Sequence, residues 1–204
     1  MRTKLQGVQE VMRRMGKHPA DALDTGGASV EAHIERVMDD ASLSVQSEGW
    51  YWNTKYDVEV SPDGDDGDKI KVSELEGVSV AVFHVDTHGD DADKDVVRKG
   101  DYLYDLDENT DAFSSSIKIR YSFERDFSEV PDSFQKWIIA LAGFNFNRYY
   151  VGSQNADSAL QIEIGDSRRQ ATREEIRARD VNVLNTQEMQ QIRGRRTTPD
   201  RSVY

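Results

Sequence analysis

The 204-residue sequence contains no cysteine, which excludes disulfide bonds, thiolate metal sites and thiol catalysis. No apolar run approaches the roughly 18–20 residues that a membrane-spanning helix needs. The charged N-terminus has a helical pattern rather than that of a signal peptide. Hydrophobic residues make up only 37% of the chain, and charged residues make up 31%. We therefore expect a soluble protein of a reducing compartment, with a modest core and some apolar surface that a partner completes.

The motifs of common enzyme classes are missing as well. The sequence has no GxSxG, no P-loop, no GxGxxG and no HExxH. The serine run at residues 114–116 has no histidine nearby, so we interpret it as a turn. We expect a protein that is not an enzyme and that needs no cofactor.

One stretch has a spacing typical of metal ligands, namely His84-x-Asp86-x-His88. On a strand these three side chains share one face, and their ligand atoms suit zinc. No second cluster completes the site, so we interpret the stretch as the end of a strand and a solvated turn. A metal-dependent enzyme stays an alternative. Residues 63–68 resemble a calcium loop only weakly, because glycine falls at the fifth position instead of the sixth.

The net charge of −12 comes from one segment. Residues 51–111 contain 18 acidic and 6 basic residues, whereas the rest of the chain has 20 of each. Such a segment is a poor candidate for binding DNA phosphates. It is either a solvated surface or a surface that docks a basic partner. A small acidic protein-binding module is therefore a second alternative.

Residues 130–152, VPDSFQKWIIALAGFNFNRYYVG, are predicted to form the central helix. Pro131 suits a first helical turn, and Gly152 suits a left-handed cap at the end. Apolar residues cover more than half of the circumference, which predicts burial on several sides. Further helical patterns cover residues 3–15, 29–48 and 157–179, the last with a weaker apolar stripe of Ala159, Ile162, Ala171 and Ile176.

Between the helix predicted at residues 29–48 and the central helix at residues 130–152, the spacing of the hydrophobic residues changes to a period of two. Strands are predicted at residues 50–60, 69–72, 78–85, 95–99, 102–106 and 117–123, with a hairpin turn at Gly100 and Asp101. We therefore predict an α+β fold. It consists of a helical bundle from both ends of the chain (residues 1–49 and 128–180), an inserted acidic antiparallel β domain (residues 50–127) and an extended C-terminal tail (residues 181–204).

Arginines of the last helix and the tail form the one basic cluster. In the helix, Arg168, Arg169, Arg173, Arg177 and Arg179 alternate with acidic residues, which predicts ion pairs on the helix face. The tail arginines suit an acidic protein groove better than nucleic acid, because no aromatic residues stand between them to stack on bases.

Four segments carry a resemblance to a known family: QSEGW at residues 46–50, KGDYLYD at 99–105, DAFSSSIKI at 111–119 and the central helix at 130–152. Their order and spacing resemble tail tubular protein A, the adaptor, or head-tail connector, of short-tailed podovirus phages. The resemblance implies a non-enzymatic virion tail protein that is assembled in the host cytoplasm. It implies a ring of twelve subunits between the portal of the capsid and the tail nozzle, tail tubular protein B. DNA passes through the channel during ejection without sequence-specific binding.

The resemblance also implies partners for particular parts of the chain. The helical part builds the ring, the β domain faces the nozzle and possible tail fibres through loops at residues 61–69 and 86–94, and the tail clamps the portal. The residues concerned are Trp137, Phe144, Phe146 and Tyr149 for the core and the subunit interface, Asp65, Asp66, Asp90 and Asp91 for the nozzle or fibre side, and Arg193, Arg195, Arg196 and Arg201 for the portal. Alone in solution, the protein can be a monomer.

Overall fold

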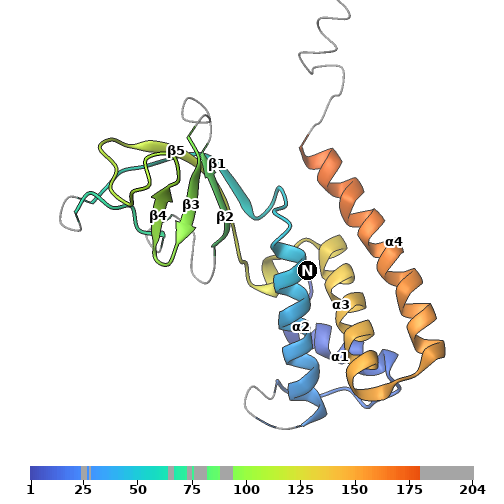
Figure 1. Cartoon of the computed structure of the whole chain (residues 1–204). Coiled ribbons are helices and arrows are strands. Elements are labelled where there is room, and N and C mark those ends of the chain that lie inside the picture. Colours follow the sequence, from blue (N-terminus) through green and yellow to red (C-terminus); the bar gives the residue numbers. More distant parts are fainter. Residues whose placement is uncertain are drawn as a thin grey trace, which may run out of the picture.

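The computed structural model describes residues 1–23, 27, 29–63, 67–72, 75, 82–87 and 94–179. Within these residues, four helices lie together and two small antiparallel sheets lie beside one end of the helical group (Figure 1). The helices come from both ends of the chain, and all the strands come from the middle. The predicted α+β class is therefore confirmed, and the predicted tail lies outside the described residues. No described helix is long and apolar enough to cross a membrane.

The two N-terminal helices begin where their caps predict. Helix α1 (Lys4–Arg14) starts with a capping box in which Thr3 and Gln6 bond each other's backbone. Helix α2 (Val30–Gln46) is capped by the Ser29 side chain, which accepts a hydrogen bond from the Ala32 backbone. Each helix turns its apolar stripe toward the main core.

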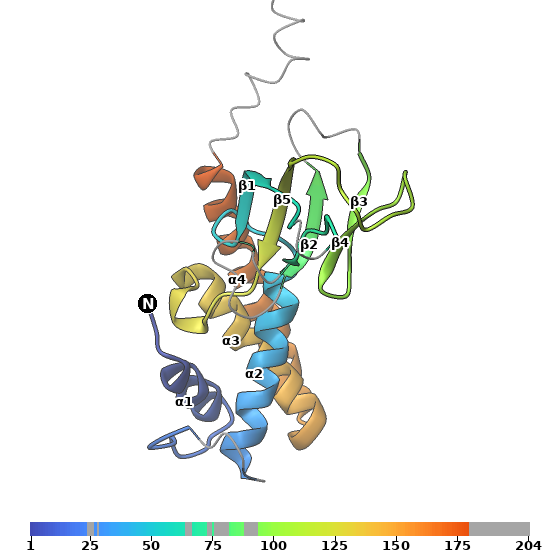
Figure 2. The ribbon, with the colours of Figure 1, turned by 90° about the vertical axis from the view of Figure 1, so that its left-hand side faces the viewer.

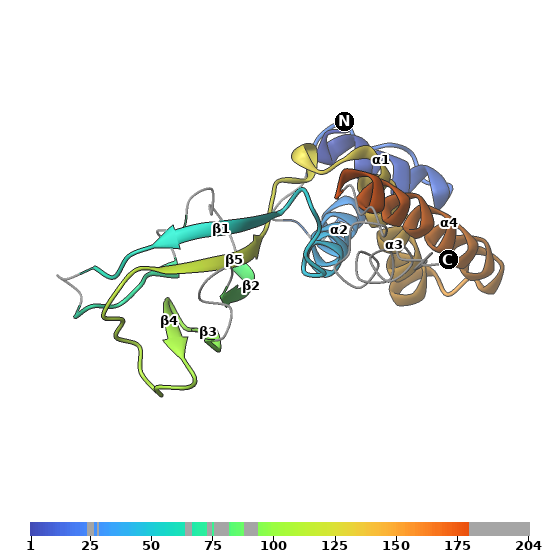
Figure 3. The ribbon, with the colours of Figure 1, turned by 90° about the horizontal axis from the view of Figure 1, so that it is seen from above.

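Helix α3 (Asp132–Phe146) is the centre of the helical group. It packs against α1, α2 and α4 (Gln154–Ala178). Figure 3 shows α2 and α4 on opposite sides of α3. The predicted burial on several sides is confirmed, because nine of its residues are buried. The helix ends earlier than predicted, since residues Asn147–Val151 form a short π-helix before the turn.

Gly152 closes this turn in the left-handed conformation, with φ +72° and no atom within 4 Å of an added Cβ. We expect Gly152→Ala to lower the free energy of unfolding by about 1–2 kcal/mol through backbone strain alone. Gly165 inside α4 is the matched control, because its added Cβ would make only an ordinary contact with Arg169. Gly165→Ala should stabilise the protein by up to about 1 kcal/mol. If urea denaturation gave the same change in the free energy of unfolding for both variants, it would contradict the role of Gly152 as a left-handed cap.

The predicted apolar stripe of α4 is wrong. Ile162 and Ile176 are 67% and 55% exposed, whereas Ala171 is fully buried. The helical period explains the difference, because Leu160 and Ala171 lie on the side that packs on α3 and Ile162 lies opposite to Ala171. The prediction gave weight to apolar identity and neglected helical phase.

The larger sheet has the strand order β1 (Thr54–Val60), β5 (Ile117–Phe123) and β2 (Val82–Thr87), and all its pairs are antiparallel. Strands β3 (Val96–Lys99) and β4 (Tyr102–Asp105) form a hairpin around Gly100, as predicted. Figure 2 shows this hairpin beyond β2. Strand β5 has the predicted bounds, with Ile117, Ile119 and Tyr121 buried in a second core between the sheets.

Three strand predictions need correction. Residues 50–53 form a turn, because Trp50 is buried in the helical core and cannot continue a strand. Residues 69–72 make only isolated bridges, such as Lys71 with Tyr102. Strand β2 continues to Thr87, and the predicted residues 78–81 before it lie outside the described part.

Candidate interaction surfaces and the helix–sheet junction

Two buried amides join the end of α2 to the larger sheet. The Gln46 side chain, which is fully buried, donates to the carbonyl of Arg125 at 2.9 Å and accepts from the Arg125 backbone N–H at 2.8 Å. Asn53, also fully buried, donates to the carbonyls of Gln46 and Phe123 at 2.9 and 3.1 Å. Trp50 donates its backbone N–H to Asn53 at 2.7 Å. These bonds fix the turn after α2 against the end of β5.

The C-terminal half of α4 binds the same turn through its carboxylates. Glu175 accepts the backbone N–H of Tyr51 at 2.9 Å, and Glu174 accepts the Tyr51 hydroxyl at 2.9 Å. Glu174 also accepts the hydroxyl of Ser133, at the start of α3. At the helix end, Arg179 donates to the carbonyl of Gly49 at 3.3 Å. Helix α4 is therefore attached both to α3 and to the junction with the sheet.

Burial raises the pKa of Tyr51 from the ordinary 10.0 to about 12, helped by the hydrogen bond to Glu174 and the charges of Glu174 and Glu175. The phenol ionises at lower pH in the unfolded chain than in the folded chain. Its contribution to stability is therefore complete below pH 10 and is lost as the pH rises from about 10 to about 12.

We expect the stability difference between the wild-type protein and Tyr51→Phe to shrink across this pH window. Urea denaturation at a series of pH values measures it, with Tyr149→Phe as the control because the Tyr149 ring is exposed. A difference that stays constant to pH 12 would contradict the role of the Tyr51 hydroxyl.

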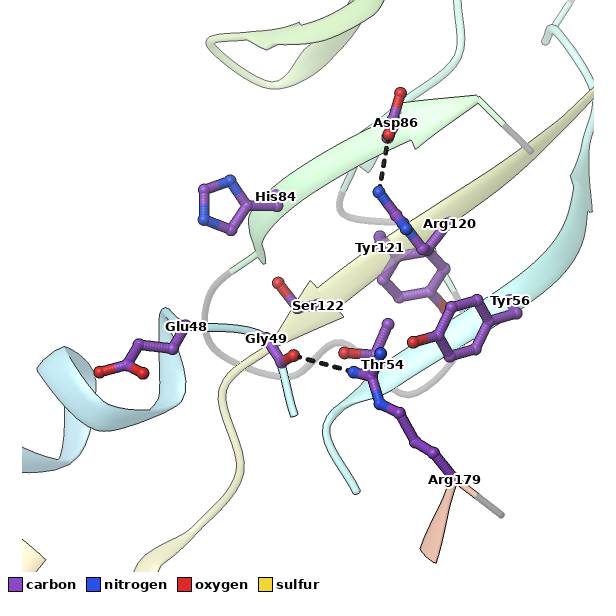
Figure 4. A pocket seen from close by; sticks show the side chains of 10 residues that line it. All are labelled: Glu48, Gly49, Thr54, Tyr56, His84, Asp86, Arg120, Tyr121, Ser122 and Arg179. Atoms are coloured by element: carbon purple, nitrogen blue, oxygen red, sulfur yellow. Dashed lines mark hydrogen bonds and ion pairs between the residues drawn. The ribbon is translucent and has the colours of Figure 1, made fainter. Parts of the chain in front are cut away.

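A polar pocket of about 210 Å³ lies where the junction meets the outer face of the sheet (Figure 4). The strand register places Thr54 and His84 on either side of Ser122. The hydroxyls of Thr54 and Ser122 are buried and have no hydrogen-bond partner among the described residues. They can hold a water molecule or a polar group of a partner.

The charges around this pocket are already paired. Arg120 binds Asp86 at 2.7 Å, Glu48 binds Arg168 at 3.4 Å, and Arg179 binds Glu175. A pocket with balanced charge has no strong preference for an anion or a cation. We therefore assign the pocket no chemistry beyond hydrogen bonding.

The predicted metal ligands are placed only in part. Asp86 is paired with Arg120, as Figure 4 shows, and His84 is exposed on the same strand. His88 lies outside the described residues, so the complete set stays a prediction. In the part of the chain that the structure describes, no three histidine, aspartate or glutamate side chains gather as metal ligands would.

The aromatic residues predicted for the core and the subunit interface divide into two groups. Trp137 and Phe146 are buried within the chain, and Phe144 is half-buried. Tyr149, by contrast, is 72% exposed. Its neighbours Tyr150 and Val151 are also exposed, and Tyr150 contacts the His33 ring of α2. These three exposed residues form an apolar patch at the turn between α3 and α4. Of the three, the sequence pattern had pointed only to Tyr149.

The other predicted contact residues cannot be placed. Asp65, Asp66, Asp90, Asp91, Arg193, Arg195, Arg196 and Arg201 all lie outside the described residues. The sequence patterns did not predict that Gln46 and Asn53 join the helices to the sheet. For Gln46, the sequence feature that could have indicated this role is its position at the start of the QSEGW segment, where α2 ends.

The sequence was compared with models of protein families and with curated proteins. A protein-family model described as tail tubular protein matches residues 5–181. This match includes every described helix and strand except the first residue of α1. No curated protein matches the chain.

Proposed function

Because the chain belongs to the tail tubular protein family of phages, we propose that it is the adaptor that joins the portal of the capsid to the tail nozzle. It is a structural protein of the phage tail. The family match over residues 5–181 carries the proposal, because it spans both the helical group and the sheets. We propose that it has no catalytic activity.

We propose that twelve copies form a ring, with residues 1–49 and 128–180 as the ring-forming part. The exposed patch of Tyr149, Tyr150 and Val151 supports this idea, since tyrosine buries much area at low entropic cost in protein contacts. Single exposed apolar residues are ordinary, but three in succession at one turn suit an interface.

The β part, residues 50–127, is proposed to face the nozzle and possible tail fibres, and residues 181–204 are proposed to bind the portal. Exposed carboxylates outnumber exposed basic residues on the described strands and loops of the β part. The acidic residues are Asp57, Glu59, Asp68, Asp86, Asp95, Asp101, Asp107, Glu108 and Asp126, and the basic ones are Arg98, Lys99 and Arg120. Where such carboxylates line the channel, they let DNA pass without phosphate contacts.

Negative-stain microscopy of the protein mixed with its portal tests the proposal. A ring with twelve-fold symmetry stacked on the portal is the expected result. A protein that does not bind the portal, or that binds it without forming a ring, would refute the adaptor function. Purification as a monomer in the absence of the portal is compatible with it, since assembly on a partner can supply the missing contacts.

A further inference from the structure

Helix α4 has an exposed outer stripe on the side opposite to α3. It consists of Ile162, Asp166, Arg169, Arg173 and Ile176, which follow one another at intervals of four and three residues. All five are exposed, and the two isoleucines are large apolar side chains with exposed fractions of 67% and 55%. Figure 3 shows α4 on the side of the helical group that faces away from the β part.

The exposed charge of α4 is mainly positive. Four arginines are exposed within the helix (Arg168, Arg169, Arg173 and Arg177), against one exposed acidic residue, Asp166. Arg169 is paired with Asp166 and Arg168 with Glu48. Arg173 and Arg177 have no ion-pair partner within the described residues. Arg173 also lines a groove with Gly165 and Thr172, which a side chain of a partner can enter.

The opposite side of the same chain has the complementary charge. Nine acidic and three basic residues are exposed on the described strands and loops of the β part. A basic surface and an acidic surface on opposite sides of one chain favour a head-to-tail contact between copies. Such a heterologous contact closes into a ring when the rotation between copies fits.

We propose that the outer stripe of α4 docks on the acidic β part of the neighbouring copy in the ring, so that the β part adds a ring contact to those of the helical part while it faces the nozzle. The inference rests on the proposed ring function. Arg173 and Arg177 meet carboxylates of the neighbour, and the two isoleucines are covered at either end of the contact. Because exposed ion pairs are screened by salt, raising the salt concentration should weaken this contact.

Charge reversal on α4 is the first test. The double variant Arg173→Glu and Arg177→Glu should reduce ring formation on the portal at least tenfold. The double variant Arg13→Glu and Lys17→Glu makes the same change of charge near the end of α1, where both side chains are exposed, and should change ring formation less than twofold. Equal effects of the two variants would overturn the proposal, because net charge alone would then explain the loss. Circular dichroism of both variants checks that they fold.

The absence of cysteine allows a direct test of the neighbour. In Arg173→Cys, the introduced thiol carries a photo-crosslinker, and the ring is irradiated on the portal. The expected crosslinked peptides come from residues 54–123 of a second copy. Crosslinks to α4 of another copy, or to the portal alone, would overturn the proposal while leaving the ring intact. If the wild-type protein forms no ring, the proposed function fails first and the inference fails with it.

Discussion

Deleting residues 181–204 is expected to abolish binding to the portal and to leave the melting temperature unchanged. All the hydrogen bonds and both cores described above lie within residues 1–179, so we expect this part of the fold to remain after the deletion. The segment contains four arginines, at 193, 195, 196 and 201, and it begins where α4 is attached to the junction. A polar segment of this kind suits ordering on a partner.

Circular dichroism melting and co-sedimentation with the portal measure the two effects. A full-length variant with the four arginines replaced by glutamine separates the role of charge from the role of chain length. It should lose much of the affinity if charge-assisted bonds carry the contact. Full affinity after the deletion would show that the portal contact lies within residues 1–180.

Gln46→Ala is expected to lower the free energy of unfolding by about 2–4 kcal/mol. The substitution removes both bonds to the Arg125 backbone and leaves an N–H and a carbonyl without partners near the core. An unsatisfied buried polar group costs about 1–3 kcal/mol, and the small side chain adds a cavity. The variant should also loosen the sheet from the helices, because Gln46 is one of the two buried amides that join the end of α2 to the end of β5.

Ser42→Ala is the matched control for Gln46. The Ser42 hydroxyl accepts the other hydrogen bond of the Gln46 amide, at 2.9 Å, and its loss leaves the bonds to Arg125 in place. We expect a cost of about 1 kcal/mol in urea denaturation. If Gln46→Ala costs no more than Ser42→Ala, water replaces the amide and the junction is weaker than the geometry indicates.

The sequence predicted those elements whose signals are local. Thr3 and Ser29 are caps that identify helix starts, and the alternation of β5 needs no partner to be recognised. The central helix was recognisable because apolar residues cover most of its circumference. The family resemblance noted on four segments is confirmed by the match over residues 5–181.

The features that were missed depend on contacts far along the chain. Gln46 is buried because it bonds Arg125, which is 79 residues away, and an isolated glutamine gives no sign of this. Residues 50–53 alternate like a strand, but the Trp50 indole N–H bonds the carbonyl of Val45 in α2 and keeps the ring in the helical core. The residues predicted to bind other tail proteins remain predictions, because most of them lie outside the described part.

The discontinuous helical group sets an order for folding during synthesis. Helix α2 ends at Gln46, but α3, which covers the apolar stripes of α1 and α2, is complete only at Phe146, 100 residues later. At roughly 5–20 residues per second, the ribosome delivers α3 about 5–20 s after α2. In that interval the sheets, which lie wholly between the two helices in sequence, can fold first. The stripes with Val8, Val11, Ile34 and Met38 lack the cover of α3 meanwhile, so a chaperone that binds the nascent chain should bind there.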